Sequence, residues 1–393
     1  MPMTAPSDFL ATRAMAVPVR PARDLRIDFF RGLGMFIILI AHVPNNSWAL
    51  WIPGRFGFSD ATEIFVFQSG MASALAFGAT FDRHGAGMLA ARTLRRVWQI
   101  YWTHIGVFMV ILALTVAAGA RPDGMTYADQ LNLVPFLHDP GGLAKALLTL
   151  RYVPNYFDIL PMYMVILLLM PVMLIAERVH VGLALTLMAG LWLAAQAGWA
   201  TLPAEPFSDR TWFFNPFGWQ LLFFTGFFLV RGRIPAPGYH RWLIAAAAIF
   251  LIASVPFSLV RWYETHPAFH DVARQLAGLT DKSAFGALRF AHFLALAYLA
   301  VQAVGERGAI LRGGAVRVVT VVGQQSLAVF ATGMVTAQIL GIWLSRGDDG
   351  ALRMTMANLV GFAVLIATAY LVRWFKAAPW ARSAPTSAAP AAR

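Results

Sequence analysis

Residues 24–42 read DLRIDFFRGLGMFIILIAH, an apolar segment that carries ionisable groups. Arg31 and His42 are eleven positions apart in it. At about 100° and about 1.5 Å per residue, this separation is three turns plus roughly 20°, so the two side chains project from one helix face about 16 Å apart. An ionisable side chain in hydrocarbon costs roughly 3 kcal/mol or more unless it faces a cavity or a partner. The segment is therefore both a candidate transmembrane helix and a candidate functional site.

The rest of the chain has the composition of a membrane protein. Of its 393 residues, 59% are hydrophobic and 13% are charged, and the mean hydropathy is +0.62. Apolar stretches of roughly 20 residues recur, and each is long enough to cross a bilayer core of about 30 Å as a helix. We expect an all-α, polytopic integral membrane protein with about ten transmembrane helices. The expected spans are 27–44, 60–81, 96–119, 157–176, 179–200, 213–230, 241–260, 285–304, 316–344 and 355–375.

The basic residues are distributed unevenly between the two sides that these spans define. With the N-terminus in the cytoplasm, 19 of the 31 lysines and arginines lie in inner segments and 11 in outer ones, and Arg31 lies within the first span. An excess of Lys and Arg in cytoplasmic segments is usual for polytopic membrane proteins. Both termini are therefore predicted to be cytoplasmic. The net charge of +12 is explained by topology, so nucleic acid is not an expected partner.

One transmembrane domain, residues 23–379, is expected between two short tails. Residues 1–22 contain arginines and prolines but no apolar core of a signal peptide, so they are predicted to form a flexible cytoplasmic tail. Residues 380–393, WARSAPTSAAPAAR, contain too little large apolar surface to fold alone and are predicted to form a second such tail. The long outer connections 120–156 and 261–284 are where binding residues are expected.

The composition also limits the chemistry. The chain has no cysteine, which rules out disulfides, thiolate nucleophiles and cysteine-ligated metals. Its nine histidines are scattered, with no HxxxH or HxD run in one helix, so no metal site is expected.

His42 is the candidate catalytic base. It lies about 21 Å along the first helix, past the midplane toward the outer face, and an imidazole can take a proton from a hydroxyl group near neutral pH. Asp60 and Glu63, at the outer start of the second span, are expected at the same depth, where either carboxylate would orient the imidazole. Two alternatives stay open. His42 could be a packed histidine bonded to another helix, and Ser59 or Asp60 could form a capping box with Glu63.

Three arginines are candidates for binding an anionic donor from the cytoplasm. Arg31 shares a face with His42 and lies at the inner margin, while Arg95 and Arg96 lie where the third span enters from the cytoplasm. The planar fork of guanidinium donors suits phosphate groups. Arginines at an inner membrane edge are also common anchors, and this alternative applies to Arg95 and Arg96.

A further group, at the outer ends of later spans, is a candidate for binding an acceptor or the carboxylate of an acyl group. Carboxylates and amides beside aromatic rings suit sugars, and cations suit a carboxylate. Interfacial aromatic belts explain the aromatic residues equally well. Lys282 lies just outside the span that carries the two basic members of the group. The group comprises Asp158, Asn215, Trp219, Gln220, Arg289 and His292.

A series of motifs, taken in their order along the chain, resembles the OpgC family of integral-membrane proteins that succinylate osmoregulated periplasmic glucans. That family is related to the acyltransferase-three superfamily. The resemblance covers residues 23–375 and rests on RDLRIDFFRG, HVPNN, FGFSDATEIFVFQSG, YFDILPMY, NPFGWQ, the Lys-x6-Arg-x2-HFL pattern from Lys282, and GQQSLAVF. The Arg31–His42 spacing is similar to the Arg-x10-His signature of the wider superfamily, whose histidine is implicated in acyl transfer.

The resemblance implies a multi-pass O-acyltransferase, a succinyltransferase, of the bacterial inner membrane. Its donor would be succinyl-CoA bound from the cytoplasm, with no permanently bound cofactor. Its acceptor would be a hydroxyl of a periplasmic glucan, and its other partners the lipid bilayer and glucan-synthesis proteins. Among the site residues, the resemblance implies roles for Arg31 and His42 only.

Three alternatives stay open at this point. Ser69 or another hydroxyl would relay the acyl group as a covalent intermediate. A transporter or flippase of an acylated or lipid-linked saccharide would use the same ionisable residues to couple movement. The third alternative is a non-catalytic scaffold for glucan-synthesis enzymes.

Overall fold

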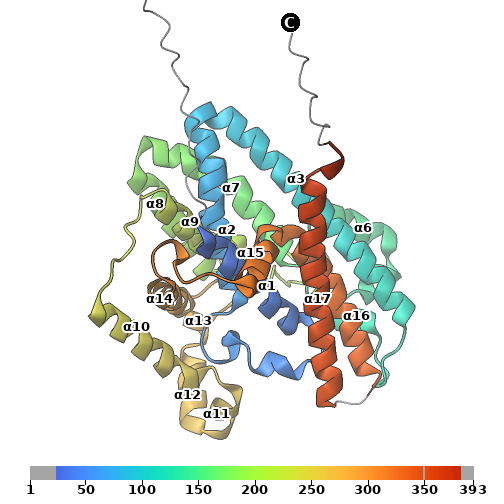
Figure 1. Ribbon diagram of the computed structural model, residues 1–393. Coiled ribbons are helices and arrows are strands. Elements are labelled where there is room, and N and C mark those ends of the chain that lie inside the picture. Colours follow the sequence, from blue (N-terminus) through green and yellow to red (C-terminus); the bar gives the residue numbers. More distant parts are fainter. Residues whose placement is uncertain (1–23, 348–349, 382–393) are drawn as a thin grey trace, which may run out of the picture.

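The computed structural model describes residues 24–347 and 350–381. The two predicted tails lie outside the described residues, apart from Trp380 and Ala381. The described part is all-helical, with no strand beyond two isolated β-bridges (Figure 1). The predicted all-α class is therefore confirmed.

Most of the long helices begin and end within several residues of a predicted span, but α3 begins at Ala79, well before the predicted span 96–119. They are α1 (Leu25–His42), α2 (Ala61–Ser73), α3 (Ala79–Ala118), α7 (Ile159–Val179), α8 (Val181–Gln196), α9 (Pro216–Val230), α10 (Arg241–Ser254), α14 (Ala287–Val304), α15 (Gly314–Gln324), α16 (Ser326–Ser345) and α17 (Ala351–Lys376). The outer connection before α14 contains α11 (Val260–Thr265), α12 (Pro267–Gln275) and α13 (Ala277–Thr280).

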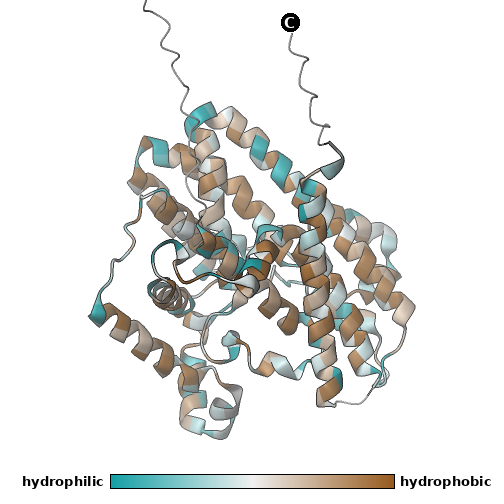
Figure 2. Cartoon of the chain, in the orientation of Figure 1, coloured by the Kyte–Doolittle hydropathy of each residue, from teal (hydrophilic) through white to brown (hydrophobic). Residues whose placement is uncertain are grey.

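Five helical stretches among the described residues are long and apolar enough to cross a membrane. They are Ala61–Ala118, α7, α14, α16 and α17. Hydrophobic residues predominate along the helices, and hydrophilic residues gather mainly at helix ends and in connections (Figure 2). The chain is thus a membrane protein, while the number of about ten spans and the cytoplasmic position of both termini stay predictions.

Helices α2 and α3 form one helical run that changes direction at two interruptions. Ala74–Gly78 forms a π-helix, and Gly85 takes φ 74° and ψ −172°. A positive φ of this kind favours glycine, which has no Cβ. Because the run bends here, α2 and α3 diverge from a shared end (Figure 1), and one continuous run contains both the second and the third predicted spans.

The predicted span 316–344 is wrong in one respect, because it consists of two helices. Helix α15 ends at Gln324, Gln325 takes φ −109° and ψ 27°, and α16 begins at Ser326. Both helices pack against α1 and α17, with α15 making the closer contact to α1, and α16 packs against α3 as well.

Two glycines allow α1 and α15 to approach at backbone distance. A Cβ atom at Gly32 would lie 1.9 Å from the carbonyl oxygen of Val319, and one at Gly323 would lie 1.9 Å from the carbonyl oxygen of Asp28. Small residues let transmembrane helices pack this closely. The contact therefore holds Arg31, the neighbour of Gly32, inside the bundle.

The predicted outer connection 120–156 is folded. It contains α4 (Tyr127–Gln130), α5 (Val134–His138) and α6 (Pro140–Leu148). Helix α6 returns alongside α3, where Tyr101 Oη donates to the carbonyl of Leu148 at 2.9 Å. The chain then reaches Tyr156, which lies against the end of α1. This connection therefore supplies part of the wall around His42.

Ion pairs between helices join residues that are predicted to lie on the same side of the membrane. Arg231, just after α9, pairs with Glu177 and with Asp82, each at 2.9 Å, and all three are predicted to be cytoplasmic. Lys282 and Asp60, both predicted to be on the outer side, pair at 2.5 Å. These pairs agree with the predicted sides of the membrane.

We expect Gly32→Ala to destabilise the protein by roughly 1–3 kcal/mol, because the added methyl group would force α1 and α15 apart. Gly106→Ala in α3 is the matched control, since a Cβ atom there meets nothing within 4 Å. The measurement is the thermal unfolding midpoint in detergent. Equal midpoints for Gly32→Ala and the native chain would contradict the close approach.

Candidate active site

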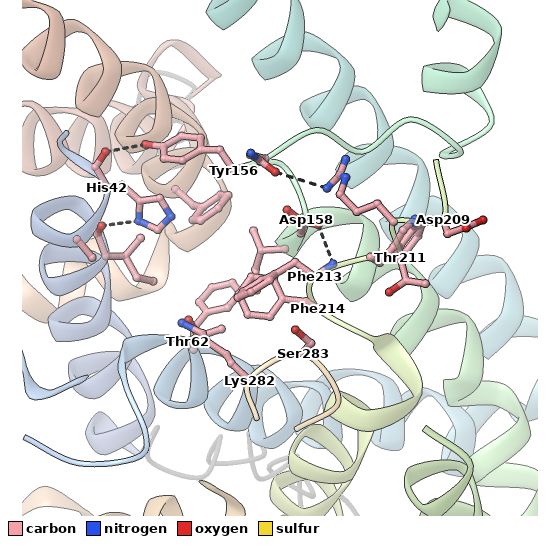
Figure 3. A pocket seen from close by; sticks show the side chains of 18 residues that line it. His42, Thr62, Tyr156, Asp158, Asp209, Thr211, Phe213, Phe214, Lys282 and Ser283 are labelled. Carbon is pink, nitrogen blue, oxygen red and sulfur yellow. Dashed lines mark hydrogen bonds between the residues drawn. The ribbon is translucent and has the colours of Figure 1, made fainter. Parts of the chain in front are cut away.

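A cavity of about 800 Å³ lies at the end of α1 (Figure 3). Its walls come from α1, α16, the starts of α2 and α7, and the connections that precede α7, α9 and α14. We call it the outer cavity, after the side on which the topology places it. Its lining includes His42, Tyr156, Asp158, Arg210, Phe214 and Lys282. It therefore combines a histidine, two carboxylates (Asp158 and Asp209), two cations and aromatic rings in one space.

Hydrogen bonds from neighbouring segments hold the end of α1. Asn46 Nδ2 donates to the carbonyl of Ile40 at 3.1 Å and to Asn358 Oδ1 at 2.9 Å. Tyr156 Oη donates to the carbonyl of His42 at 3.2 Å, and its ring lies edge-on to the imidazole with centroids 4.7 Å apart. The last carbonyls of a helix have no partner within it, so these bonds fix the helix end and with it the histidine.

The imidazole of His42 is oriented by its own helix. Its Nδ1 lies 2.7 Å from the carbonyl oxygen of Ile38, one turn earlier. A carbonyl oxygen only accepts hydrogen bonds, so Nδ1 carries the proton. In a neutral ring Nε2 is then the acceptor, and Figure 3 shows this second nitrogen on the side of the cavity. His42 is thus held in the tautomer that a base facing the cavity requires.

The predicted capping box at the start of α2 is confirmed. Asp60 N–H donates to Glu63 Oε2 at 2.7 Å, and Asp60 Oδ1 accepts from Thr62 N–H at 2.7 Å. Within the described part of the chain, neither carboxylate forms a hydrogen bond with His42. The expected carboxylate–imidazole contact is therefore not formed, because the carbonyl of Ile38 occupies Nδ1.

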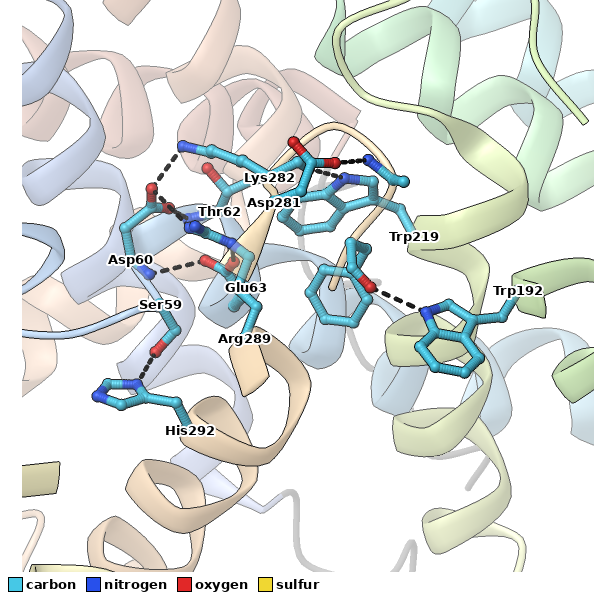
Figure 4. Close-up of polar contacts among 12 residues, drawn as sticks. Ser59, Asp60, Thr62, Glu63, Trp192, Trp219, Asp281, Lys282, Arg289 and His292 are labelled. Carbon is cyan, nitrogen blue, oxygen red and sulfur yellow. Dashed lines mark hydrogen bonds and ion pairs between the residues drawn. The ribbon is translucent and has the colours of Figure 1, made fainter. Parts of the chain in front are cut away.

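The same two carboxylates bind cations of the segment that leads into α14 (Figure 4). Asp60 Oδ2 lies 2.5 Å from Lys282 Nζ and 3.5 Å from Arg289 Nη2, and Glu63 Oε1 lies 2.5 Å from Arg289 Nε. Glu63 is fully buried, and Arg289 is 8% exposed. We call these four residues the α2–α14 ion network. It ties the wall of the outer cavity together.

A smaller pocket of about 160 Å³ lies near the other end of α1. We call it the inner pocket, and its lining includes Arg31, Arg96 and Ser69. Arg31 Nη2 donates to the carbonyl of Gln68 at 2.6 Å. Arg95 is exposed and does not line this pocket. The structure therefore brings together two of the three arginines that were predicted to bind a donor.

A family model described as OpgC protein matches residues 23–377 of the chain. The chain belongs to the OpgC family. Membership implies a transferase that modifies glucans, and the matched region contains both the outer cavity and the inner pocket. No curated protein and no solved structure matches the chain.

The sequence predicted two basic residues of α14, Arg289 and His292, as candidates for acceptor or carboxylate binding, and neither lines the outer cavity. Arg289 belongs to the α2–α14 ion network, and His292 Nδ1 lies 2.8 Å from Ser59 Oγ. The cation from this segment that does line the cavity is Lys282. Its position one turn before α14 was visible in the OpgC motif, but its orientation depends on Asp60, 222 residues away.

Three residues of the OpgC motif NPFGWQ lie behind the cavity and shape it indirectly. Asn215 caps α9, and its backbone N–H donates to the carbonyl of Ser283 at 3.0 Å. Trp219 is fully buried, and its Nε1 donates to the carbonyl of Lys282 at 2.9 Å. Gln220 Nε2 donates to the carbonyl of Met188 at 2.7 Å. The first two hold the segment that carries Lys282, and none of the three lines the cavity.

Asp158 and Arg210 are two of the polar residues on the opposite wall of the outer cavity. Asp158 Oδ1 accepts from Phe213 N–H at 3.1 Å. Sequence reasoning missed Arg210, because it lies in an irregular connection with no motif around it. Its Nη2 donates to the carbonyl of Val153 at 2.8 Å and lies 3.0 Å from Glu205.

The charge of Glu205 holds Arg210 in place. Burial alone would raise the pKa of Glu205, but hydrogen bonds from Ser208 and Arg210, together with the Arg210 charge, keep that pKa below its ordinary value. Glu205 is therefore ionised at neutral pH, and Arg210 stays at the edge of the cavity.

We expect Arg289→Met to destabilise the protein by roughly 3–5 kcal/mol, because it leaves the buried carboxylate of Glu63 without its closest cation. The double variant Glu63→Gln/Arg289→Met should recover part of that loss, since no buried charge is then left alone. Thermal unfolding in detergent measures both. A double variant no more stable than Arg289→Met would argue against the pairing.

Proposed function

We propose that this OpgC-family protein transfers a succinyl group from succinyl-CoA, bound on the cytoplasmic side, to a hydroxyl of a periplasmic glucan in the outer cavity, with His42 as general base. The geometry of His42 is the observation that carries the proposal. Its Nδ1 is held by the Ile38 carbonyl at 2.7 Å, and its other nitrogen faces a cavity of about 800 Å³. Protein pockets that bind small molecules have about this volume.

The proposed reaction is a direct transfer in two steps. His42 Nε2 takes the proton of the glucan hydroxyl while the hydroxyl oxygen attacks the thioester carbonyl of the donor. The tetrahedral intermediate then collapses, the C–S bond breaks, and an ester C–O bond remains. The CoA sulfur leaves with the proton from Nε2, so the imidazole returns to its neutral state.

The inner pocket suits the acyl end of the donor. Its volume of about 160 Å³ is one fifth of that of the outer cavity. The inner pocket is therefore too small for a nucleotide. The nucleotide phosphates would therefore remain at the cytoplasmic edge near Arg95 and Arg96, while Arg31 faces the arm that enters.

Lys282 is the group that we assign to the distal carboxylate of the succinyl group. An acyl arm that enters from the inner pocket presents this carboxylate first to the outer cavity, where Lys282 lies. A charged hydrogen bond from an ammonium group favours such a ligand. Lys282 also pairs with Asp60 in the α2–α14 ion network, but it lines the outer cavity, whereas Arg289, the residue expected from the sequence, does not.

The structure favours direct transfer over a serine relay. Ser69 lines the inner pocket, but that lining contains no histidine, aspartate or glutamate among the described residues. A serine nucleophile needs a base within hydrogen-bond reach. The proposed base, His42, lies on the same face of α1 as Arg31 but lines the outer cavity and not the inner pocket.

We expect His42→Gln to lower succinyl transfer by roughly 100-fold or more, because the hydroxyl then lacks its proton acceptor. The assay uses purified protein in detergent, labelled succinyl-CoA and a neutral glucan, with ester formation followed by mass spectrometry. His138→Gln is the control, since His138 is exposed on α5. An unchanged rate for His42→Gln would rule out the proposed base. Transfer without a sealed membrane would also exclude obligate transport.

We expect Lys282→Gln to lower the ratio of succinyl to acetyl transfer by roughly tenfold, the worth of one hydrogen bond to a charged group. The ratio does not depend on how much of the protein is folded. Lys145→Gln, a change at an exposed lysine of α6, should leave the ratio unaltered. Equal losses of the succinyl and the acetyl transfer rates after Lys282→Gln would show that Lys282 does not bind the distal carboxylate.

A further inference from the structure

The inner pocket and the outer cavity share two lining residues, Phe65 of α2 and Phe330 of α16. Their rings are stacked, with centroids 6.2 Å apart and planes inclined by 23°. Both side chains are buried. The pair therefore forms the boundary between the space that Arg31 lines and the space that His42 lines.

The boundary is apolar, whereas both spaces that it separates contain charged groups. On the inner side Tyr163 packs against Phe65, with ring centroids 6.3 Å apart. The rings of Phe65 and Phe330 come from different helices and are held together only by non-covalent packing. The interaction of a single aromatic pair is weak. An arm that enters between them can displace them without breaking a covalent or ionic contact.

We propose that Phe65 and Phe330 form a gate through which the acyl arm reaches His42, and that this gate keeps outer-cavity water from the donor and limits the width of the acyl group. The nature of the arm rests on the proposed function. The gate itself is a property of the two spaces and can be tested without any acyl donor.

The gate protects the donor from a side reaction. If water entered in place of the glucan hydroxyl, its oxygen would attack the thioester carbonyl, the C–S bond would break, and the products would be free succinate and CoA thiol. Excluding water from a reactive centre prevents this kind of loss. Two stacked phenyl rings present no hydrogen-bonding group to water, so the closed pair suits this role.

The first test measures access to the inner pocket from the outer side. The native chain has no cysteine, so Ser69→Cys introduces a single thiol, in the lining of the inner pocket. A small, membrane-impermeant anionic thiosulfonate is added to sealed vesicles on the side where the outer cavity opens. We expect slow labelling of Ser69→Cys and labelling faster by roughly tenfold or more when Phe65→Ala is added.

Phe67→Ala is the matched control. Phe65 and Phe67 lie on the same helix and are each 7% exposed, but Phe67 packs against Phe293, with centroids 5.2 Å apart, and lines neither space. Equal labelling rates with Phe65→Ala and Phe67→Ala would overturn the gate. Because labelling needs no succinyl-CoA, this result is distinct from a failure of the proposed function, which would appear as no transfer by the native protein.

The second test measures loss of the acyl group to water. We expect Phe330→Ala to raise CoA release without glucan, relative to transfer, by roughly fivefold or more. Phe330→Trp should narrow the gate and slow transfer and hydrolysis together, so that their ratio does not rise, and Phe330→Leu serves if the alanine variant does not fold. A ratio of hydrolysis to transfer that is the same in all variants and in the native chain would overturn the role in excluding water.

Discussion

The burial of a charged helix is the constraint on which the rest of this structure depends. Asp28 and Arg31 of α1 are 1% and 9% exposed, and hydrocarbon offers such groups no partner. Helices α2, α15, α16 and α17 pack around α1 as a result. The backbone approach at Gly32 and Gly323 makes this enclosure tight. Both the inner pocket and the outer cavity are spaces left along the enclosed helix, one toward each end.

The polar groups of the interior form three sets. The inner pocket has its arginines, the outer cavity has His42 with Lys282 and Arg210, and the α2–α14 ion network pairs its two carboxylates with two cations. Aromatic side chains lie between the inner pocket and the outer cavity. Lys282 joins the outer cavity to the network, because it lines the cavity and also balances the charge of Asp60.

Local pattern predicted the helices, the shared face of Arg31 and His42, and the capping box of Asp60 and Glu63, since each depends on residues within a few turns of chain. Contacts between distant segments were not predictable in this way. The partner of Asp60 is Lys282, 222 residues away, and the sequence around Arg210 contains no motif. The break at Gln325 was also missed, because glutamine is not a helix-breaking residue type.

The bond between His42 and the carbonyl of Ile38 also bears on how the imidazole responds to acidity. A carboxylate partner would itself gain a proton in acid and release its hold on the ring. A peptide carbonyl has no such transition, so it accepts from Nδ1 whether or not the solution is acidic. The ring is therefore held in one orientation by a group that does not titrate.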